Sequence, residues 1–66
     1  MDIAKELKKI MVDEDITLKA LADKLNTSQP NLSNKFKRNN FSTKELTEIS
    51  NALGYEFNII FKKREI

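Results

Sequence analysis

Apolar residues recur along most of the chain with the spacing that places them on one side of an α-helix, in four separate stripes. The stripes are Ile3, Leu7, Ile10 and Met11; Leu18, Leu21, Ala22 and Leu25; Leu32 and Phe36; and Leu46, Ile49, Ala52 and Leu53. The pattern predicts four short helices whose apolar sides face a core. The first helix is expected to end near Val12, before the acidic connector Asp13-Glu14-Asp15.

Capping residues mark the ends of these helices. A Ser or Thr suited to the N-cap position precedes each of the last three stripes: Thr17, Ser28 and Ser42. Glu45 completes a capping box for the fourth helix, and Pro30 fits a first helical turn, where its missing N–H leaves no bond unmade. Asn26 and Gly54 tolerate the positive φ of a sharp turn, so the second and fourth helices are expected to stop there. Arg38-Asn39-Asn40 is expected to form the loop between the third and fourth helices.

From Tyr55 the apolar period changes to two, which is typical of a β-strand. Phe57, Ile59 and Phe61 fall on one side of this strand, which ends in the basic run Lys62-Lys63-Arg64. A lone strand is not stable in water. We therefore expect the apolar side to pack on the helices and the edge of the strand to pair with a second copy of the chain.

The overall charge of +2 is unevenly distributed. Residues 17–44 hold six lysines and arginines against the single acid Asp23, a net charge of +5, whereas residues 1–16 and 45–66 carry −2 and −1. A phosphate-binding surface requires such a concentration of positive charge, and an evenly solvated surface does not. The charge pattern therefore favours a nucleic-acid partner for the middle of the chain.

The composition narrows the function classes. A chain of 66 residues forms at most one domain and buries little surface, so we expect a partner subunit to add stability. The absence of cysteine excludes disulfides and fits a reducing cytoplasm. With no histidine, no cysteine and no glycine-rich phosphate loop, the sequence predicts neither an enzyme nor a cofactor, metal or small-molecule site. The longest apolar run, Ile59-Ile60-Phe61, is too short for a membrane span.

The second and third helices are separated by one tight turn, and the third carries polar side chains at most of its other positions. These are Gln29, Asn31, Ser33, Asn34, Lys35 and Lys37. Two short helices arranged in this way form a helix-turn-helix, whose second helix enters the DNA major groove. Asn and Gln amides can pair with adenine, and lysine and serine can bind guanine or phosphate. The sequence predicts that the helix after Ser28 lies in the major groove.

Residues 17–33 resemble the helix-turn-helix of the Cro and phage-repressor (XRE-like) family, and the resemblance covers roughly residues 3–54. Its most specific elements are the helix that starts at Thr17, the Leu21-Ala22 pair, the Ser28-Gln29 start and Leu32-Ser33. The resemblance implies a mainly α, lambda-repressor-like domain of four helices over residues 1–54. The predicted C-terminal β-strand, residues 55–66, follows this domain as a dimerisation element.

The resemblance also implies which residues approach DNA. Three amides face base edges: Gln29, Asn31 and Asn34. Seven residues approach phosphates: Thr17, Ser28, Lys35, Lys37, Arg38, Asn39 and Asn40. Leu18 stands where many members have a glutamine that contacts the DNA backbone, so that contact is not expected here.

These observations predict sequence-specific binding of double-stranded DNA by a small cytoplasmic transcriptional regulator. We expect a repressor that binds a palindromic operator as a homodimer, with half-sites about one helical turn (~34 Å) apart. The subunits are expected to meet at Tyr55, Phe57, Ile59 and Phe61. Two alternatives stay open: a monomer whose strand frays, and a protein-interaction module, antitoxin-like or a phage accessory protein, that docks through the strand. Phe36, Phe41 and Phe57 could stack on single-stranded nucleic acid, but their spacing favours core packing.

Overall fold

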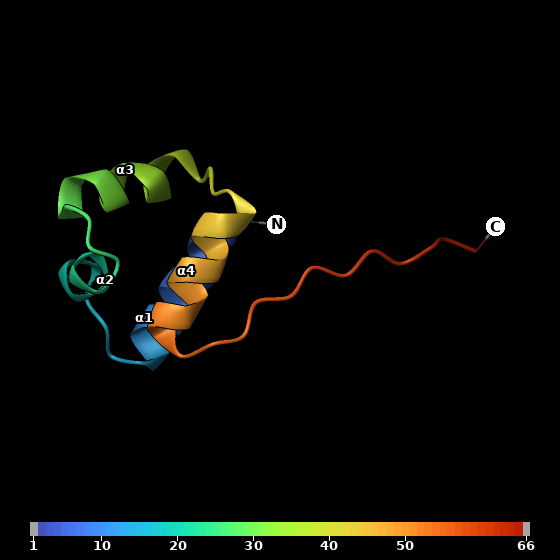
Figure 1. The fold of residues 1–66 in the computed structure, drawn as a ribbon, viewed down its shortest axis with the longest axis horizontal. Helices are drawn as coiled ribbons and strands as arrows, with labels where there is room; N and C mark the ends of the chain where they lie inside the picture. The colour runs from blue at the N-terminus through green and yellow to red at the C-terminus, as the bar shows by residue number, and fades with distance from the viewer. Residues whose placement is uncertain (1, 66) are drawn as a thin grey trace.

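The computed structural model describes residues 2–65, which form four helices and an extended C-terminal segment. The helices are α1 (Ile3–Asp13), α2 (Leu18–Lys24), α3 (Gln29–Arg38) and α4 (Thr43–Leu53). In Figure 1, α3 crosses the top of the view and α2 is seen end on below it. α2 contacts both α3 and α4. The prediction of four helices is confirmed, and none in the described part of the chain is long and apolar enough to cross a membrane.

Each helix begins at a side chain that accepts a hydrogen bond from the first turn. Thr17 Oγ1 and Ser28 Oγ accept from the backbone N–H three residues further on, at 3.1 and 3.2 Å. Ser42 and Glu45 form the predicted capping box of α4. These caps confirm the predicted helix starts, because each satisfies a backbone N–H that has no partner within the helix. Asp2 caps α1 in the same way, and this cap was not predicted.

Positive φ angles mark the turns between the helices. Among the described residues other than glycine, three have them: Asp15 (53°), Asn26 (57°) and Asn39 (52°). Gly54, with φ 79°, closes α4 as predicted. The sharp turn predicted at Asn26 is confirmed, although α2 itself ends earlier, at Lys24. Arg38, which was expected in the loop, is instead the last residue of α3. Asn and Asp tolerate this conformation because their short side chains can bond locally.

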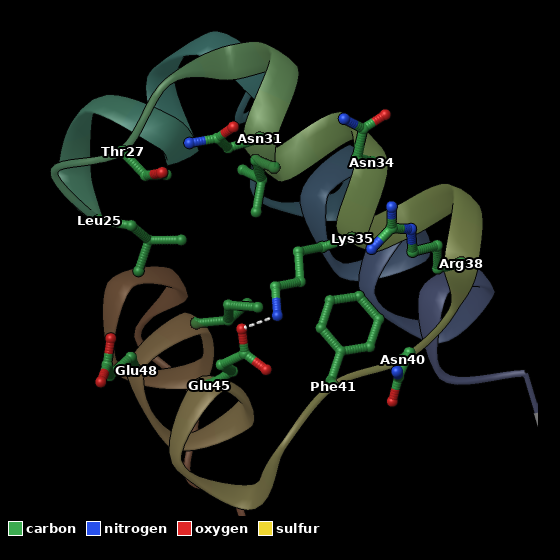
Figure 2. Close-up of a pocket in the computed structure, with 12 residues that line it drawn as sticks. Leu25, Thr27, Asn31, Asn34, Lys35, Arg38, Asn40, Phe41, Glu45 and Glu48 are labelled. Carbon is green, nitrogen blue, oxygen red and sulfur yellow. Dashed lines mark ion pairs between the residues drawn. The ribbon is translucent and has the colours of Figure 1, made fainter.

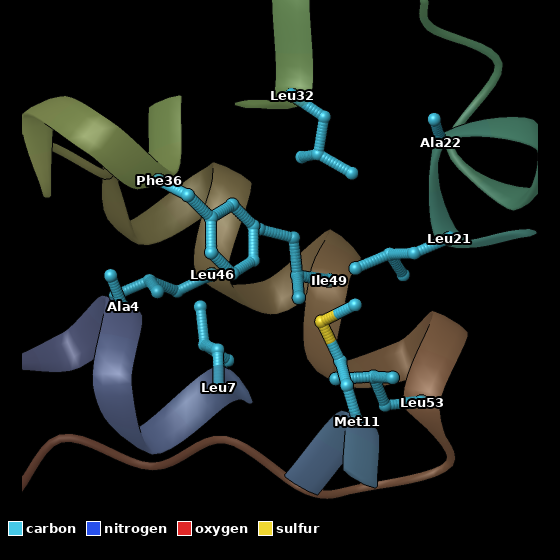
Figure 3. Close-up of a cluster of buried hydrophobic side chains, with 10 residues drawn as sticks. All are labelled: Ala4, Leu7, Met11, Leu21, Ala22, Leu32, Phe36, Leu46, Ile49 and Leu53. Atoms are coloured by element: carbon cyan, nitrogen blue, oxygen red, sulfur yellow. The ribbon is translucent and has the colours of Figure 1, made fainter. Parts of the chain in front are cut away.

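The four apolar stripes meet in one core (Figure 3). Its buried members are Ala4, Leu7, Met11, Leu21, Ala22, Leu32, Phe36, Leu46, Ile49 and Leu53. Leu32 and Phe36 attach α3 to this core, as their spacing predicted. Phe41 and Phe57 pack against it, and the rings of Phe36 and Phe41 meet edge to face with centroids 5.4 Å apart. The prediction that these phenylalanines pack in the core is therefore confirmed.

The prediction of a C-terminal β-strand is wrong. Within the described residues 55–65 the chain forms neither strand nor helix, and in Figure 1 it leads away from the four helices. Phe57 is half-buried against the core, whereas Ile59, Ile60 and Phe61 are 52%, 85% and 95% exposed. The apolar side expected to pack on the helices therefore does so only at Phe57.

The physical reason is that a strand needs a second strand. Alternating apolar residues favour extended backbone, but a β-strand exists only through backbone hydrogen bonds to a neighbouring strand. The rest of the described chain is helix and short turns, so no other segment can supply that neighbour. The domain is therefore all helical, and its last packed side chain is that of Phe57.

Candidate nucleic-acid interface

The outer face of α3 is polar because its two apolar residues are both used by the core. Successive residues of an α-helix are about 100° apart, so Asn34 stands opposite the midpoint of Leu32 and Phe36. Asn31 and Lys37 lie on either side of Asn34 on this outer face, and all three side chains are exposed. α3 thus presents two amides and a cation to solvent, held in place by Leu32 and Phe36.

Five of the predicted DNA-contacting residues line one groove of about 530 Å³ between α3 and α4 (Figure 2). They are Asn31, Asn34, Lys35, Arg38 and Asn40. Glu45 and Glu48 of α4 line the opposite wall. Gln29 is exposed at the start of α3 but is not part of the groove, so the structure does not bring it together with the other two predicted base readers.

The predicted phosphate contacts occupy several places. Thr17 and Ser28 are the exposed N-caps of α2 and α3, and each hydroxyl oxygen accepts a backbone hydrogen bond. The hydroxyl hydrogen is not used by this bond, so it can still be donated to a phosphate oxygen. Lys37 and Arg38 lie in the last turn of α3, both exposed. These four residues therefore sit at the two ends of α3 and at the start of α2.

Asn39 holds the loop after α3 to the start of α1. Its Oδ1 accepts a hydrogen bond from the backbone N–H of Ala4 at 2.8 Å, across 35 positions of sequence. Ala4 lies in the first turn of α1, where the N–H has no partner within the helix. Asn39 was predicted only as a phosphate contact, and nothing in the sequence pattern indicated this long-range bond. The side-chain NH₂ group can still donate to another partner.

Glu45 is a second residue whose role at the interface was not predicted. The Lys35 ammonium forms an ion pair with Glu45 Oε2, drawn as the dashed line in Figure 2. Glu45 Oε1 accepts a hydrogen bond from the backbone N–H of Ser42 at 2.8 Å, within the capping box. The capping box could be read from the sequence, but nothing in the sequence indicated that its carboxylate reaches a lysine of α3.

These two contacts lower the pKa of Glu45. The pKa falls from 4.5 to about 2, mainly because Lys35 donates to the carboxylate and secondly because the backbone N–H of Ser42 does so. Both donors stabilise the charged form more than the neutral form. The side chain of Glu45 is still 32% exposed, so solvent screens part of this stabilisation.

We expect this carboxylate to make stability depend on pH. Because its pKa is lower in the folded chain, the stabilisation is complete above pH 4.5 and is lost as the pH falls towards 2. Urea unfolding across this range should show a smaller pH-dependent loss of stability for Glu45→Gln than for the wild-type chain. The control is Glu48→Gln, which changes a carboxylate on the same groove wall. Equal pH dependence in Glu45→Gln and wild type would contradict the expectation.

Comparison with known families agrees with the geometry. Residues 6–58 match the sequence profile of the Cro/C1-type HTH DNA-binding domain. The match takes in all of α2, α3 and α4, and ends beside Phe57, the last side chain packed on the core. No curated protein and no solved structure matches the chain. The matched family is a regulatory, non-enzymatic kind of domain. The chain therefore belongs to the Cro/C1-type helix-turn-helix DNA-binding family.

Proposed function

We propose that the protein is a transcriptional repressor that binds a palindromic operator as a homodimer, with α3 in the major groove. The observation that carries this proposal is the outward polar face of α3 in a chain of a DNA-binding family. Asn31 and Asn34 lie on or beside the middle of that face, and their amides can pair with the edge of adenine. Gln29 reads bases from the first position of the helix. Repression follows from occupancy alone, because a protein on the promoter blocks polymerase.

Affinity comes from groups around this face. Lys37 and Arg38 bind phosphates at the end of α3, while the Thr17 and Ser28 hydroxyls donate to phosphates at the starts of α2 and α3. Asn40 lies in the loop after α3 and contacts a phosphate there. These contacts fix the protein on the duplex and carry no sequence information, so they act on every DNA alike. Such a protein works in the cytoplasm, where it reaches the DNA.

The dimer is proposed to form through the C-terminal segment, residues 55–65. Tyr55, Ile59 and Phe61 are exposed, whereas Phe57 already packs on its own domain. Burial of exposed apolar surface is favourable by roughly 25 cal/mol per Å². In a two-fold dimer the same apolar residues of both copies can cover each other. The exposed segment thus supports self-association, and a two-fold dimer matches the symmetry of a palindromic site.

Selection of bound sequences from a random duplex pool tests the proposed function. We expect an inverted repeat with half-site centres about one helical turn, ~34 Å, apart. A single unrepeated half-site would contradict the dimer, and the absence of any enriched sequence would contradict sequence-specific binding.

A second candidate function is a protein-interaction module, which the exposed Ile59-Ile60-Phe61 run favours. In that case the C-terminal segment docks on a different protein, and DNA binding is secondary. Retention on duplex DNA at low salt, with elution as salt rises, separates the two functions, because a pure docking module makes few phosphate contacts.

Replacing Asn31 by alanine should relax the base preference at one position of each half-site, by about 1–3 kcal/mol. The fold should persist, because the side chain is exposed and the cap bond of Ser28 uses only the backbone N–H of Asn31. Titration of operator variants measures the preference. Lys37→Ala is the contrasting variant: it should weaken binding to all sequences and flatten the salt dependence by about 0.9 in log–log slope. Unchanged preference in Asn31→Ala would reject its role.

A further inference from the structure

The carboxylate of Glu45 is fixed in place by its own helix. One oxygen accepts the backbone N–H of Ser42, and the Ser42 hydroxyl in turn accepts the backbone N–H of Glu45 at 3.1 Å. The other oxygen is left to point at α3, where it pairs with the Lys35 ammonium. The capping box therefore holds the negative charge of Glu45 next to α3.

Lys35 is a flexible side chain in a position where a second anion would compete for it. It comes from the same turn of α3 as Asn34, and in Figure 2 the amide of Asn34 points away from α4 while Lys35 crosses towards Glu45. The side chain of Lys35 is 47% exposed, so its ammonium is open to solvent as well as to the carboxylate. Its long stem and single charged end suit it to phosphate, which is the role first predicted for it.

We propose that Glu45 holds Lys35 back from the DNA backbone and so limits the affinity of the protein for DNA of any sequence. The proposal rests on the proposed binding of α3 to DNA. Non-specific binding is almost entirely electrostatic, and each phosphate neutralised by a cation contributes to it. A cation already neutralised by an internal carboxylate contributes nothing. The Lys35–Glu45 pair therefore removes one sequence-independent phosphate contact. It leaves unchanged the Asn amides that discriminate between sequences.

The substitution Glu45→Gln isolates this effect because it keeps the fold of the helix start. Glutamine can accept the same bond from the backbone N–H of Ser42, as it does in natural capping boxes. Only the charge that holds Lys35 is lost. Glu48→Gln is the matched control: it removes the same charge from the same wall of the groove, one turn further along α4. Repulsion between the protein and DNA falls equally in both variants, but only the first releases Lys35.

The measurement is binding to a short duplex of random sequence over a range of salt concentrations. We expect Glu45→Gln to steepen the log–log salt slope by about 0.9 and to raise affinity about eightfold near 0.1 M salt, as one added phosphate contact does. Glu48→Gln should keep the slope of the wild type. Adding Lys35→Met to Glu45→Gln should return the slope to the wild-type value, because the released cation is then gone. Circular dichroism confirms that each variant is folded.

Two results would overturn the proposal. One is an equal slope in Glu45→Gln and Glu48→Gln, which means that no new contact forms. The other is a steeper slope that survives Lys35→Met, which means that the new contact is not made by Lys35. Both differ from a failure of the proposed function, in which the wild-type chain itself shows no salt-dependent binding to the duplex.

Discussion

Replacing Leu21 by alanine is expected to lower the free energy of unfolding by about 3 kcal/mol, within the range of about 2–5 kcal/mol for a buried leucine. Leu21 has no exposed surface, and it is the largest fully buried side chain in the described part of the chain. It lies on α2, which contacts both α3 and α4, so a cavity there weakens the attachment of α3 to the core. A domain of this size has little stability to spare, and a large fraction of the variant should be unfolded.

Urea unfolding followed by circular dichroism measures this loss, and Ile60→Ala is the control. Ile60 is 85% exposed on the C-terminal segment, so its truncation should change the stability of the monomer by less than about 0.5 kcal/mol. DNA binding by Leu21→Ala should fall in proportion to the unfolded fraction. Equal stability of Leu21→Ala and Ile60→Ala would contradict the burial of Leu21 in the core.

The local part of the fold could be predicted from the sequence because its signals lie within a few residues of one another. The apolar stripes gave the four helices, and Thr17, Ser28 and Ser42 gave their starts. A capping bond joins atoms three residues apart, so a short stretch of sequence contains both partners. The same holds for Gly54, whose positive φ depends on its own lack of a side chain.

The parts that could not be predicted depend on segments far apart in the chain. The alternation after Tyr55 predicted a β-strand but could not reveal that the described part of the chain holds no neighbouring strand for it. The prediction for Lys35 failed to include its partner for the same reason. Lys35 was predicted to contact phosphate, but the pattern of α3 alone does not reveal the α4 carboxylate that faces it. The polar face of α3 could be predicted from the apolar pattern, since that face is set by Leu32 and Phe36 within the helix itself.

Asn39 gives the second large expected effect, because one residue supplies both a hydrogen bond and an unusual backbone angle. Asn39→Ala removes the acceptor of the Ala4 N–H and places alanine at φ 52°. The lost bond costs about 1 kcal/mol and the left-handed backbone about 1 kcal/mol more, so we expect a loss of about 2 kcal/mol. Asn39→Gly keeps the backbone angle accessible and should lose about half as much. Thermal or urea unfolding of the two variants separates the contribution of the hydrogen bond to stability from that of the backbone angle.

Asn39→Asp separates the structural role of this residue from the phosphate contact predicted for it. Aspartate keeps an oxygen for the Ala4 N–H and tolerates the left-handed conformation, so stability should stay close to that of the wild-type chain. The added negative charge lies directly after Lys37 and Arg38, in the loop proposed to approach phosphates. DNA affinity should therefore fall for every sequence while the fold is unchanged. If a stable Asn39→Asp chain bound DNA with wild-type affinity, Asn39 would not lie near the DNA backbone. Its role would then be only structural, in joining the loop to α1.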